Sequence, residues 1–392
     1  MSCRTLIVGG GIGGLAAALA CSGVGNEVEL FERSTEFTEV GAGIQLGPNV
    51  MKVLYGWGLE DGLEAVAAFP DRLQVRDANS GDELGVLRLG AVSVQRYGSP
   101  YATVHRADLH ALLLSAVRQQ GAAQLHLQSE VASFEQHDLG VVLHTTDGRV
   151  VPGDALVGAD GLWSSVRRRL LNDGTPHVTG HLAYRALVEQ HCLPERLRSQ
   201  QVTAWLGPEF HVVQYPVRRG AWLNVVAIVQ GRIVGAVEHW DHSANAAKLR
   251  DRMTATCPAL QDLIQAIDHW RLWGLSRRAP MQGPGEQAQG RVALLGDAAH
   301  PMVPYLAQGA GMAIEDANAL AEALRISGSD VPNALKNYAN VRWRRNVRVQ
   351  AGAIRNGEIF HATGLMRWGR DTAMRLLGER LLDLPWLYRG LP

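Results

Sequence analysis

A glycine-rich turn near the N-terminus constrains the fold of this chain more than any other feature. Residues 4–9 form a short apolar run that predicts a buried strand, and a helix is predicted to follow it. The turn between them reads Gly9-x-Gly11-x-x-Gly14, in which the first glycine permits a tight turn, the second lets the backbone approach a pyrophosphate, and the third lets the helix pack on the strand. A second apolar run, residues 28–31, completes a strand–turn–helix–strand unit. This unit predicts dinucleotide binding, because phosphate binds well at the positive end of a helix.

An acidic residue follows the second apolar run. Glu32 stands 18 residues after Gly14, where a carboxylate can hydrogen-bond a ribose hydroxyl of the dinucleotide. Glu32 and its neighbour Arg33 are therefore candidate cofactor-binding residues. A purely structural turn is the alternative, but strand, turn, helix, second strand and acidic residue all favour binding. The motif by itself does not distinguish NAD from FAD.

Two later acidic turns bear on that choice. Ala159-Asp160-Gly161 follows the apolar run 155–157, and Gly296-Asp297-Ala298 follows the apolar run 291–295. Each acid has a plain structural explanation, Asp160 as a helix N-cap and Asp297 as a turn residue. A simple NAD dehydrogenase does not need two additional acidic turns at strand ends. The three motifs in this order therefore favour FAD.

Together these motifs resemble the fingerprints of the FAD-dependent aromatic hydroxylases, the class A flavoprotein monooxygenases. The resemblance extends from residue 4 to about residue 360. It implies that Asp297 binds a ribityl hydroxyl of FAD, and that Asp160 serves both the flavin and the reduced nicotinamide. It also implies that Arg106 contacts the phosphate or ribityl groups of FAD.

A predicted helix over residues 309–324 resembles the helix that lies beneath the pyrimidine edge of the flavin in this family. Reduced flavin carries negative charge at that edge, and the positive N-terminal end of a helix stabilises an anion. The resemblance therefore adds Ala310 and Gly311 to the cofactor-binding residues. Packing of an amphipathic helix is the plainer interpretation, and the two are compatible.

The expected fold class is α/β, with a Rossmann-type FAD-binding domain (GR2/PHBH-like), an inserted β-sheet substrate domain and a helical C-terminus. Strands are predicted over residues 183–188, 202–206, 211–217 and 222–229, a small antiparallel sheet over about 120–152, and helices over 244–253 and 260–267. The expected domains are 1–75, 100–180 and 280–325 for FAD binding, 76–99 and 181–279 for the substrate, and 326–392 for the C-terminal helices.

Three further segments most resemble the 3-hydroxybenzoate 6-hydroxylases within this family, with salicylate hydroxylases and 6-hydroxynicotinate 3-monooxygenases as near relatives. They are residues 41–49, 205–208 and 215–220. The resemblance implies that His211 and Tyr215 lie over the substrate ring as catalytic residues. Four positions apart on a predicted strand, they face the same side of the sheet. On residue type alone, a surface histidine and a core tyrosine would be the simpler explanation.

The resemblance also places Gln45, Pro304 and Tyr305 in the substrate pocket. Pro304 stands where the 3-hydroxybenzoate enzymes carry a glutamine. The 6-hydroxynicotinate enzymes carry a proline there, but histidines at the positions of Gln45 and Tyr305. The pattern is mixed, so the aromatic substrate and the position of hydroxylation stay open.

The expected activity is hydroxylation of a small phenolic or aromatic carboxylic acid through a flavin C4a-hydroperoxide, with FAD as cofactor, NADH (or NADPH) as reductant and O2 as oxidant. The alternatives are a 6-hydroxynicotinate-type monooxygenase, a flavin epoxidase or quinone-pathway hydroxylase, and a non-catalytic dinucleotide-binding regulator. The regulator would not need a polar pair on the middle sheet.

Composition limits the other partners. Lys plus Arg is 38 and Asp plus Glu is 38, so no nucleic acid or anionic membrane surface is expected. No apolar run reaches the ~18 residues of a membrane span. The four cysteines are scattered without a C-x-x-C pair, which favours a reducing cytoplasm and gives no metal site. Apolar residues within 361–392 alternate with charges, which favours core packing or a homodimer.

Overall fold

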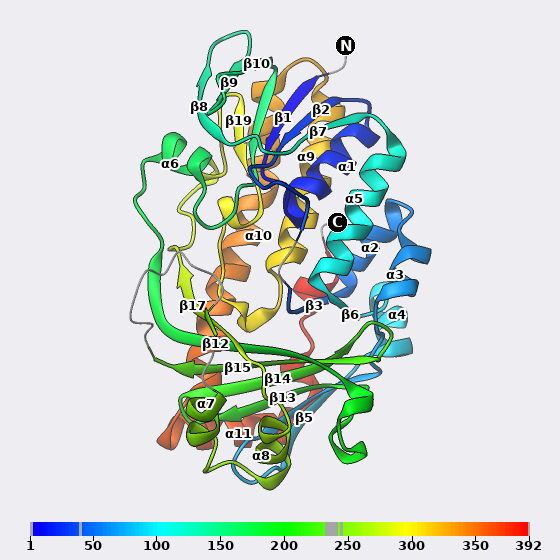
Figure 1. Ribbon diagram of the computed structural model, residues 1–392, viewed down its shortest axis with the longest axis vertical. Helices are drawn as coiled ribbons and strands as arrows, with labels where there is room; N and C mark the ends of the chain where they lie inside the picture. Colours follow the sequence, from blue (N-terminus) through cyan, green and yellow to red (C-terminus); the bar gives the residue numbers. More distant parts are fainter. Residues whose placement is uncertain (1–2, 39–40, 232–241, 244–245, 391–392) are drawn as a thin grey trace.

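The computed structural model describes residues 3–38, 41–231, 242–243 and 246–390. Its two largest sheets have six and eight strands. They lie toward opposite ends of an elongated molecule, with helices between and beside them (Figure 1).

The six-stranded sheet forms around the strand that precedes the glycine-rich turn. Its order is β18-β19-β11-β1-β2-β7, and all neighbours pair in parallel except β18 with β19. The strands are β1 (Arg4–Val8), β2 (Glu27–Phe31), β7 (Ala123–His126), β11 (Ala155–Gly158), β18 (Ala288–Gln289) and β19 (Val292–Leu294). Three separated parts of the chain contribute them. The glycine turn and the two acidic turns therefore follow the carboxyl ends of β1, β11 and β19 at one edge of the sheet, where such sheets bind their ligands.

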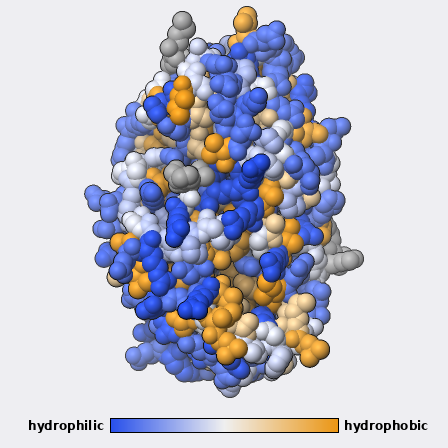
Figure 2. Space-filling view, turned by 180° about the vertical axis from the view of Figure 1, so that it is seen from behind, coloured by the Kyte–Doolittle hydropathy of each residue, from blue (hydrophilic) through white to orange (hydrophobic). Residues whose placement is uncertain are grey.

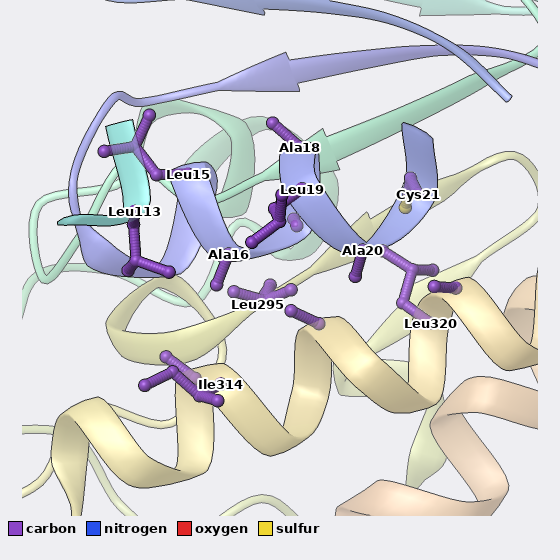
Figure 3. Packing of buried hydrophobic residues seen from close by; sticks show 14 of the residues in the cluster. Leu15, Ala16, Ala18, Leu19, Ala20, Cys21, Leu113, Leu295, Ile314 and Leu320 are labelled. Carbon is purple, nitrogen blue, oxygen red and sulfur yellow. The ribbon is translucent and has the colours of Figure 1, made fainter. Parts of the chain in front are cut away.

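The two faces of this sheet build two cores, because successive side chains of a strand point to opposite sides. Ile7 and Leu30 pack against helices α1 (Ile12–Gly23), α5 (Arg106–Gln120) and α9 (Gly309–Ser327). Small alanines of α1 face larger side chains of α9 such as Leu320, so the two helices pack closely (Figure 3). On the other face, residues such as Leu6 and Phe31 pack against a small antiparallel sheet and helix α6 (Ser165–Leu171).

That small sheet confirms only part of the expectation for residues 120–152. It consists of β8 (Val131–Gln136), β9 (Val141–Thr145) and β10 (Val150–Gly153). The expectation was wrong for β7, which joins the six-stranded sheet by parallel pairing with β2. The reason is topological: helix α5 returns the chain to the edge of the sheet, so the next strand adds in parallel there.

The eight-stranded sheet has the order β16-β17-β12-β15-β14-β13-β4-β5, antiparallel throughout except for β13 with β4. Its strands are β4 (Arg72–Asp77), β5 (Glu83–Arg88), β12 (His177–Glu189), β13 (Val202–Gly207), β14 (Phe210–Val217), β15 (Trp222–Gln230), β16 (His242–Ser243) and β17 (Arg271–Arg277). The strands predicted between 183 and 229 are all present. The expected domain boundaries stay a prediction, and β4 crosses the one at 75–76.

The two faces of the large sheet have different partners. Val212, Val225 and Ala227 point outward and form a core with α7 (Ala246–Arg252) and α8 (Pro258–Gln265). The alternate residues, such as Ile228, point toward the six-stranded sheet and α10. We call this second side the inner face. Of the predicted helix 244–253, residues 244–245 lie outside the described residues.

The C-terminal part is helical, as predicted. The remaining helices are α10 (Val331–Phe360), α11 (Gly364–Leu377), α12 (Glu379–Leu382) and α13 (Pro385–Tyr388) at the C-terminus, and α2 (Pro48–Gly56), α3 (Glu60–Val66) and α4 (Gly90–Tyr97) earlier in the chain. A buried ion-pair cluster fixes α10 to α9: Arg342 contacts Asp316 at 2.6 Å and Glu315 at 2.7 Å. No helix within the described residues is both long and apolar enough to cross a membrane.

Candidate active site

The glycine-rich turn forms a cradle that a larger residue would fill. Gly9 has φ of +105°, and a Cβ on it would lie 2.5 Å from the carbonyl oxygen of Ala159. A Cβ on Gly14 would lie 1.8 Å from the carbonyl oxygen of Gly9. Helix α1 begins after Gly11 without a side-chain cap and without an acidic residue in its first turn. The cradle and this uncapped helix end fit a pyrophosphate.

Glu32 lies against this cradle. Its Oε2 accepts a hydrogen bond from the N–H of Gly10 at 2.6 Å, and its Oε1 accepts one from the N–H of Ser34 at 2.8 Å. Burial raises the pKa of Glu32, but these hydrogen bonds outweigh it, so the pKa is lowered and the group is a carboxylate. This position fits the predicted contact with a ribose hydroxyl. The neighbouring Arg33 is exposed.

Asp160 bonds to the start of helix α6, whose N-cap residue is Ser164. Its Oδ2 accepts hydrogen bonds from the N–H groups of Ser165 at 2.7 Å and Val166 at 3.2 Å, and its Oδ1 accepts one from the hydroxyl of Ser164. The N-cap position suggested for Asp160 is thus occupied by Ser164, and Asp160 satisfies two further N–H groups of the first turn. Its contact with the cofactor stays a prediction.

Asp297 and the start of α9 lie side by side. Asp297 sits in a one-turn 3-10 helix and is exposed, and a Cβ on Gly309 would lie 3.9 Å from its Oδ1. Helix α9 has no side-chain cap and no acid in its first turn. Gly311 is buried, and a Cβ on it would lie 2.6 Å from Val50, while Ala310 is half-buried. An exposed carboxylate beside an uncapped helix end fits ribityl hydroxyls and an anionic flavin edge.

Arg106 begins helix α5 near the same site. Its backbone N–H donates to the carbonyl oxygen of Ala42 at 3.1 Å, directly before strand β3 (Gly43–Leu46). Strand β3 pairs with β6 (Ala102–His105), so the segment 41–49 and the start of α5 are held together. The start of α5 thus lies beside the segment 41–49, and the charge of Arg106 acts on Arg185 of the large sheet.

His211 and Tyr215 both lie on the inner face, as the alternation on β14 predicted. They are 2% and 4% exposed. Val213 stands between them on the same face, and four residues of strand span about 13 Å. Tyr215 bonds to strand β3, and His211 bonds to a residue beyond α10. The inner face therefore carries two separate polar sites, one around Tyr215 and one around His211.

Tyr215 joins the large sheet to strand β3. Its hydroxyl donates to the carbonyl oxygen of Gly43 at 2.6 Å, and the N–H of Gly43 donates to Oδ1 of Asn224 at 2.6 Å. A Cβ on Gly43 would lie 2.5 Å from the Tyr215 ring, so only glycine allows this approach. Burial raises the pKa of Tyr215, so its hydroxyl stays protonated.

His211 belongs to a cluster of three histidines and a tyrosine. Its Nδ1 lies 2.8 Å from Nε2 of His361, and the hydroxyl of Tyr305 lies 2.7 Å from Nδ1 of His181. The rings of His211 and Tyr305 have centroids 5.3 Å apart. Burial, together with the neighbouring imidazoles, lowers the pKa of His211 well below its usual range and that of His361 to about 4. The histidines of this cluster are therefore neutral near pH 7.

The three predicted pocket residues do not lie together: one is near the Tyr215 site and two are near the His211 site. Gln45 lies on β3, two residues after the Gly43 that Tyr215 contacts, and accepts a hydrogen bond from the hydroxyl of Tyr101 at 2.6 Å. Tyr305 lies in the histidine cluster. Pro304 begins a 3-10 helix next to Tyr305 and is exposed.

Sequence reasoning missed four inner-face or neighbouring residues, which are Arg185, His181, Asn224 and His361. Strand alternation could have indicated Arg185 and Asn224, because both lie on predicted strands. His361 follows helix α10 and is 150 positions from His211, so no local pattern connects them.

Comparison with known proteins then identifies the family. A family model for the FAD-binding domain matches residues 2–352. The chain belongs to this family. Together with its relatives, this match makes the protein an FAD-dependent monooxygenase.

Three relatives represent the similarity. The 3-hydroxybenzoate 6-hydroxylase of Polaromonas naphthalenivorans is 37% identical over 386 residues, which cover 98% of this chain and 95% of that protein. The 6-hydroxynicotinate 3-monooxygenase of Bordetella bronchiseptica is 35% identical over 355 residues, which cover 88% of this chain and 89% of that protein. A solved salicylate hydroxylase substrate complex superposes with a TM-score of 0.83 at 28% identity, covering 99% of this chain and 95% of that one. The resemblance inferred from the motifs is thereby confirmed.

Proposed function

We propose that this monooxygenase hydroxylates a small phenolic or aromatic carboxylic acid of the hydroxybenzoate or salicylate type, with NADH or NADPH as reductant and O2 as oxidant. One observation carries the proposal: the buried hydroxyl of Tyr215, on the inner face of the large sheet, bonds to Gly43 beside the cofactor-binding elements. The names of the relatives, which act on hydroxybenzoate, hydroxynicotinate and salicylate, support the substrate class. When bound, FAD accepts a hydride from the nicotinamide and activates O2.

We propose that FAD lies along the edge described above, between the glycine cradle and the inner face. The residues assigned to it are Gly9, Gly11, Gly14, Glu32, Arg33, Arg106, Asp160, Asp297, Ala310 and Gly311. The arrangement supports this assignment because the uncapped ends of α1 and α9 are two separate positive sites. The first would bind pyrophosphate, and the second would face the flavin ring.

The residues of the inner face have distinct parts in substrate binding. Tyr215 already donates its proton to Gly43, so its oxygen is left to accept a hydrogen bond from the substrate hydroxyl. His211 is neutral and can accept a proton or a hydrogen bond. Val213 and Val226, adjacent on paired strands, offer an apolar surface for the ring and help exclude water.

A 6-hydroxynicotinate-type substrate is the second candidate, and Pro304 favours it. The experiment is a panel assay on the purified yellow protein with 3-hydroxybenzoate, 4-hydroxybenzoate, salicylate, 6-hydroxynicotinate and a quinone. Hydroxylated product, NADH consumption and hydrogen peroxide are measured together. We expect a benzoate to give product in near-stoichiometric ratio to NADH. Product from the quinone alone, or peroxide with every acid, would refute the proposed function.

We also propose a homodimer that works in the cytoplasm. Large apolar side chains of α11 are exposed, among them Leu365 at 88% and Trp368 at 70%. Figure 2 shows apolar side chains among charged ones on the lower part of the back face. The four cysteines are unpaired, as a reducing compartment allows. Light scattering of wild type and Trp368→Glu tests the dimer, which the variant should weaken.

A further inference from the structure

Arg185 occupies a defined place on the inner face, facing the same space as the two predicted catalytic residues. In the register of the sheet, Arg185 of β12 pairs with Val226 of β15, and Val226 pairs with Val213 of β14. Val213 lies between His211 and Tyr215. Arg185 is therefore two strands, or about 10 Å, from β14, with Val226 of β15 between them.

The guanidinium of Arg185 has no anionic partner among the described residues. Its Nε is buried and makes no hydrogen bond, and its Cζ lies 5.0 Å from the centre of the Trp273 ring. Two groups act on its pKa through their charge: Tyr215 raises it, and the repelling cation of Arg106 lowers it. Burial lowers the pKa of Arg185 to about 10, which still leaves it charged at neutral pH. A desolvated cation without a counter-ion is costly, so this one is placed to gain from an incoming anion.

The four arginines of the described chain that are buried as whole residues differ from Arg185, which is half-buried. Each of the four has a carboxylate partner: Arg167 and Arg278 contact Asp173, Arg342 contacts Asp316, and Arg370 contacts Asp371. These arginines stabilise the fold through their ion pairs. Arg185 departs from that pattern at the one place where the substrate is proposed to bind.

We propose that Arg185 binds the carboxylate of the aromatic acid. A guanidinium forms two parallel hydrogen bonds with a carboxylate, and Trp273 beneath it holds its plane in position. One aromatic ring then spans Val226 and Val213, which directs the substrate hydroxyl toward Tyr215 or His211. This inference rests on the proposed function. It adds that Arg185 is the residue by which the enzyme distinguishes an aromatic acid from a neutral phenol.

The test measures binding without turnover. Holoenzyme is titrated with the aromatic acid that gives most product in the panel, and with its primary amide, while the flavin absorbance change reports Kd. For Arg185→Met, we expect the Kd of the acid to rise on the order of 10- to 100-fold, the usual range for a lost charge-assisted pair. The Kd of the neutral amide should change less than about threefold. FAD content and melting temperature should match wild type.

Two further variants make the outcome decisive. Arg185→Lys keeps the charge and should retain part of the preference for the acid. Arg252→Met, on α7 at the outer face, should bind both ligands as wild type does. Equal loss for acid and amide, or loss of FAD from both Arg185 variants, would overturn the assignment. If wild type hydroxylates the acid and Arg185→Met binds it unchanged, only this inference fails; if wild type binds no aromatic acid, the proposed function fails too.

Discussion

The imidazoles of His211 and His361 share a hydrogen bond of 2.8 Å between Nδ1 and Nε2, although they lie on β14 and beyond the end of α10. The same cluster includes His181, and the charge of Arg370 also acts on His361. Burial disfavours protonation of all three rings. The end of α10 is thus attached to the eight-stranded sheet by neutral histidines.

The first prediction follows from these lowered pKa values. The unfolded chain takes up protons near pH 6.5, whereas folded His361 resists them until about pH 4. Stability from this cluster is therefore full above pH 6.5 and is lost as the pH falls toward 4, by roughly 1.4 kcal/mol per pH unit for each proton taken up. Urea unfolding of holoenzyme between pH 7.5 and 4.5 measures the slope. His361→Gln should flatten it, while exposed His191→Gln should not; equal slopes for all three proteins would contradict the prediction.

Tyr215→Phe should separate hydroxylation from flavin reduction. The change keeps the ring and its packing but removes the oxygen proposed to meet the substrate, together with its hydrogen bond to Gly43. We expect hydroxylation to fall on the order of 10²-fold, as for loss of one positioned acid–base group. NADH oxidation should fall less, and the difference should appear as hydrogen peroxide. FAD content should be unchanged. Wild-type coupling in this variant would show that the substrate does not lie against β14.

Asp297→Ala should weaken FAD retention, because its exposed carboxylate stands beside the uncapped end of α9. Equilibrium dialysis against FAD gives the dissociation constant, which we expect to rise about tenfold or more, as for a lost hydrogen bond to a charged group. Asp251→Ala, exposed on α7 at the outer face, is the matched control. An unchanged FAD affinity in Asp297→Ala would remove Asp297 from the cofactor site.

Arg342→Met should destabilise the fold strongly. Arg342 is fully buried and contacts both Asp316 and Glu315, so its removal leaves buried Asp316 without an arginine and Glu315 with Arg345 alone. The free energy of unfolding should fall by roughly 3–5 kcal/mol. Arg325→Ala is the control. Arg325 pairs with Glu322 on the surface of α9, the helix that also carries Glu315 and Asp316, and its removal should have no measurable effect on the free energy of unfolding. Similar small losses in both variants would mean that the buried cluster relaxes to admit water.

The sequence by itself determined the cofactor fold. Gly9 and Gly14 can only be glycines, since a Cβ at either position would meet backbone atoms, and the apolar runs around them have the period of strands and helices. Strand alternation likewise determined that His211 and Tyr215 face the same side of a sheet. These features depend on local geometry, which a linear pattern records.

Only the tertiary structure decided which residues meet across that sheet. The bond from Tyr215 to Gly43 joins residues 172 positions apart, and that from His211 to His361 joins residues 150 positions apart. Whether Arg185 is paired or alone depends on which strands lie beside β12 and which carboxylates they carry. Such contacts depend on strand order and on the docking of α10, because packing between distant elements is set by the assembled core rather than by neighbours in the chain.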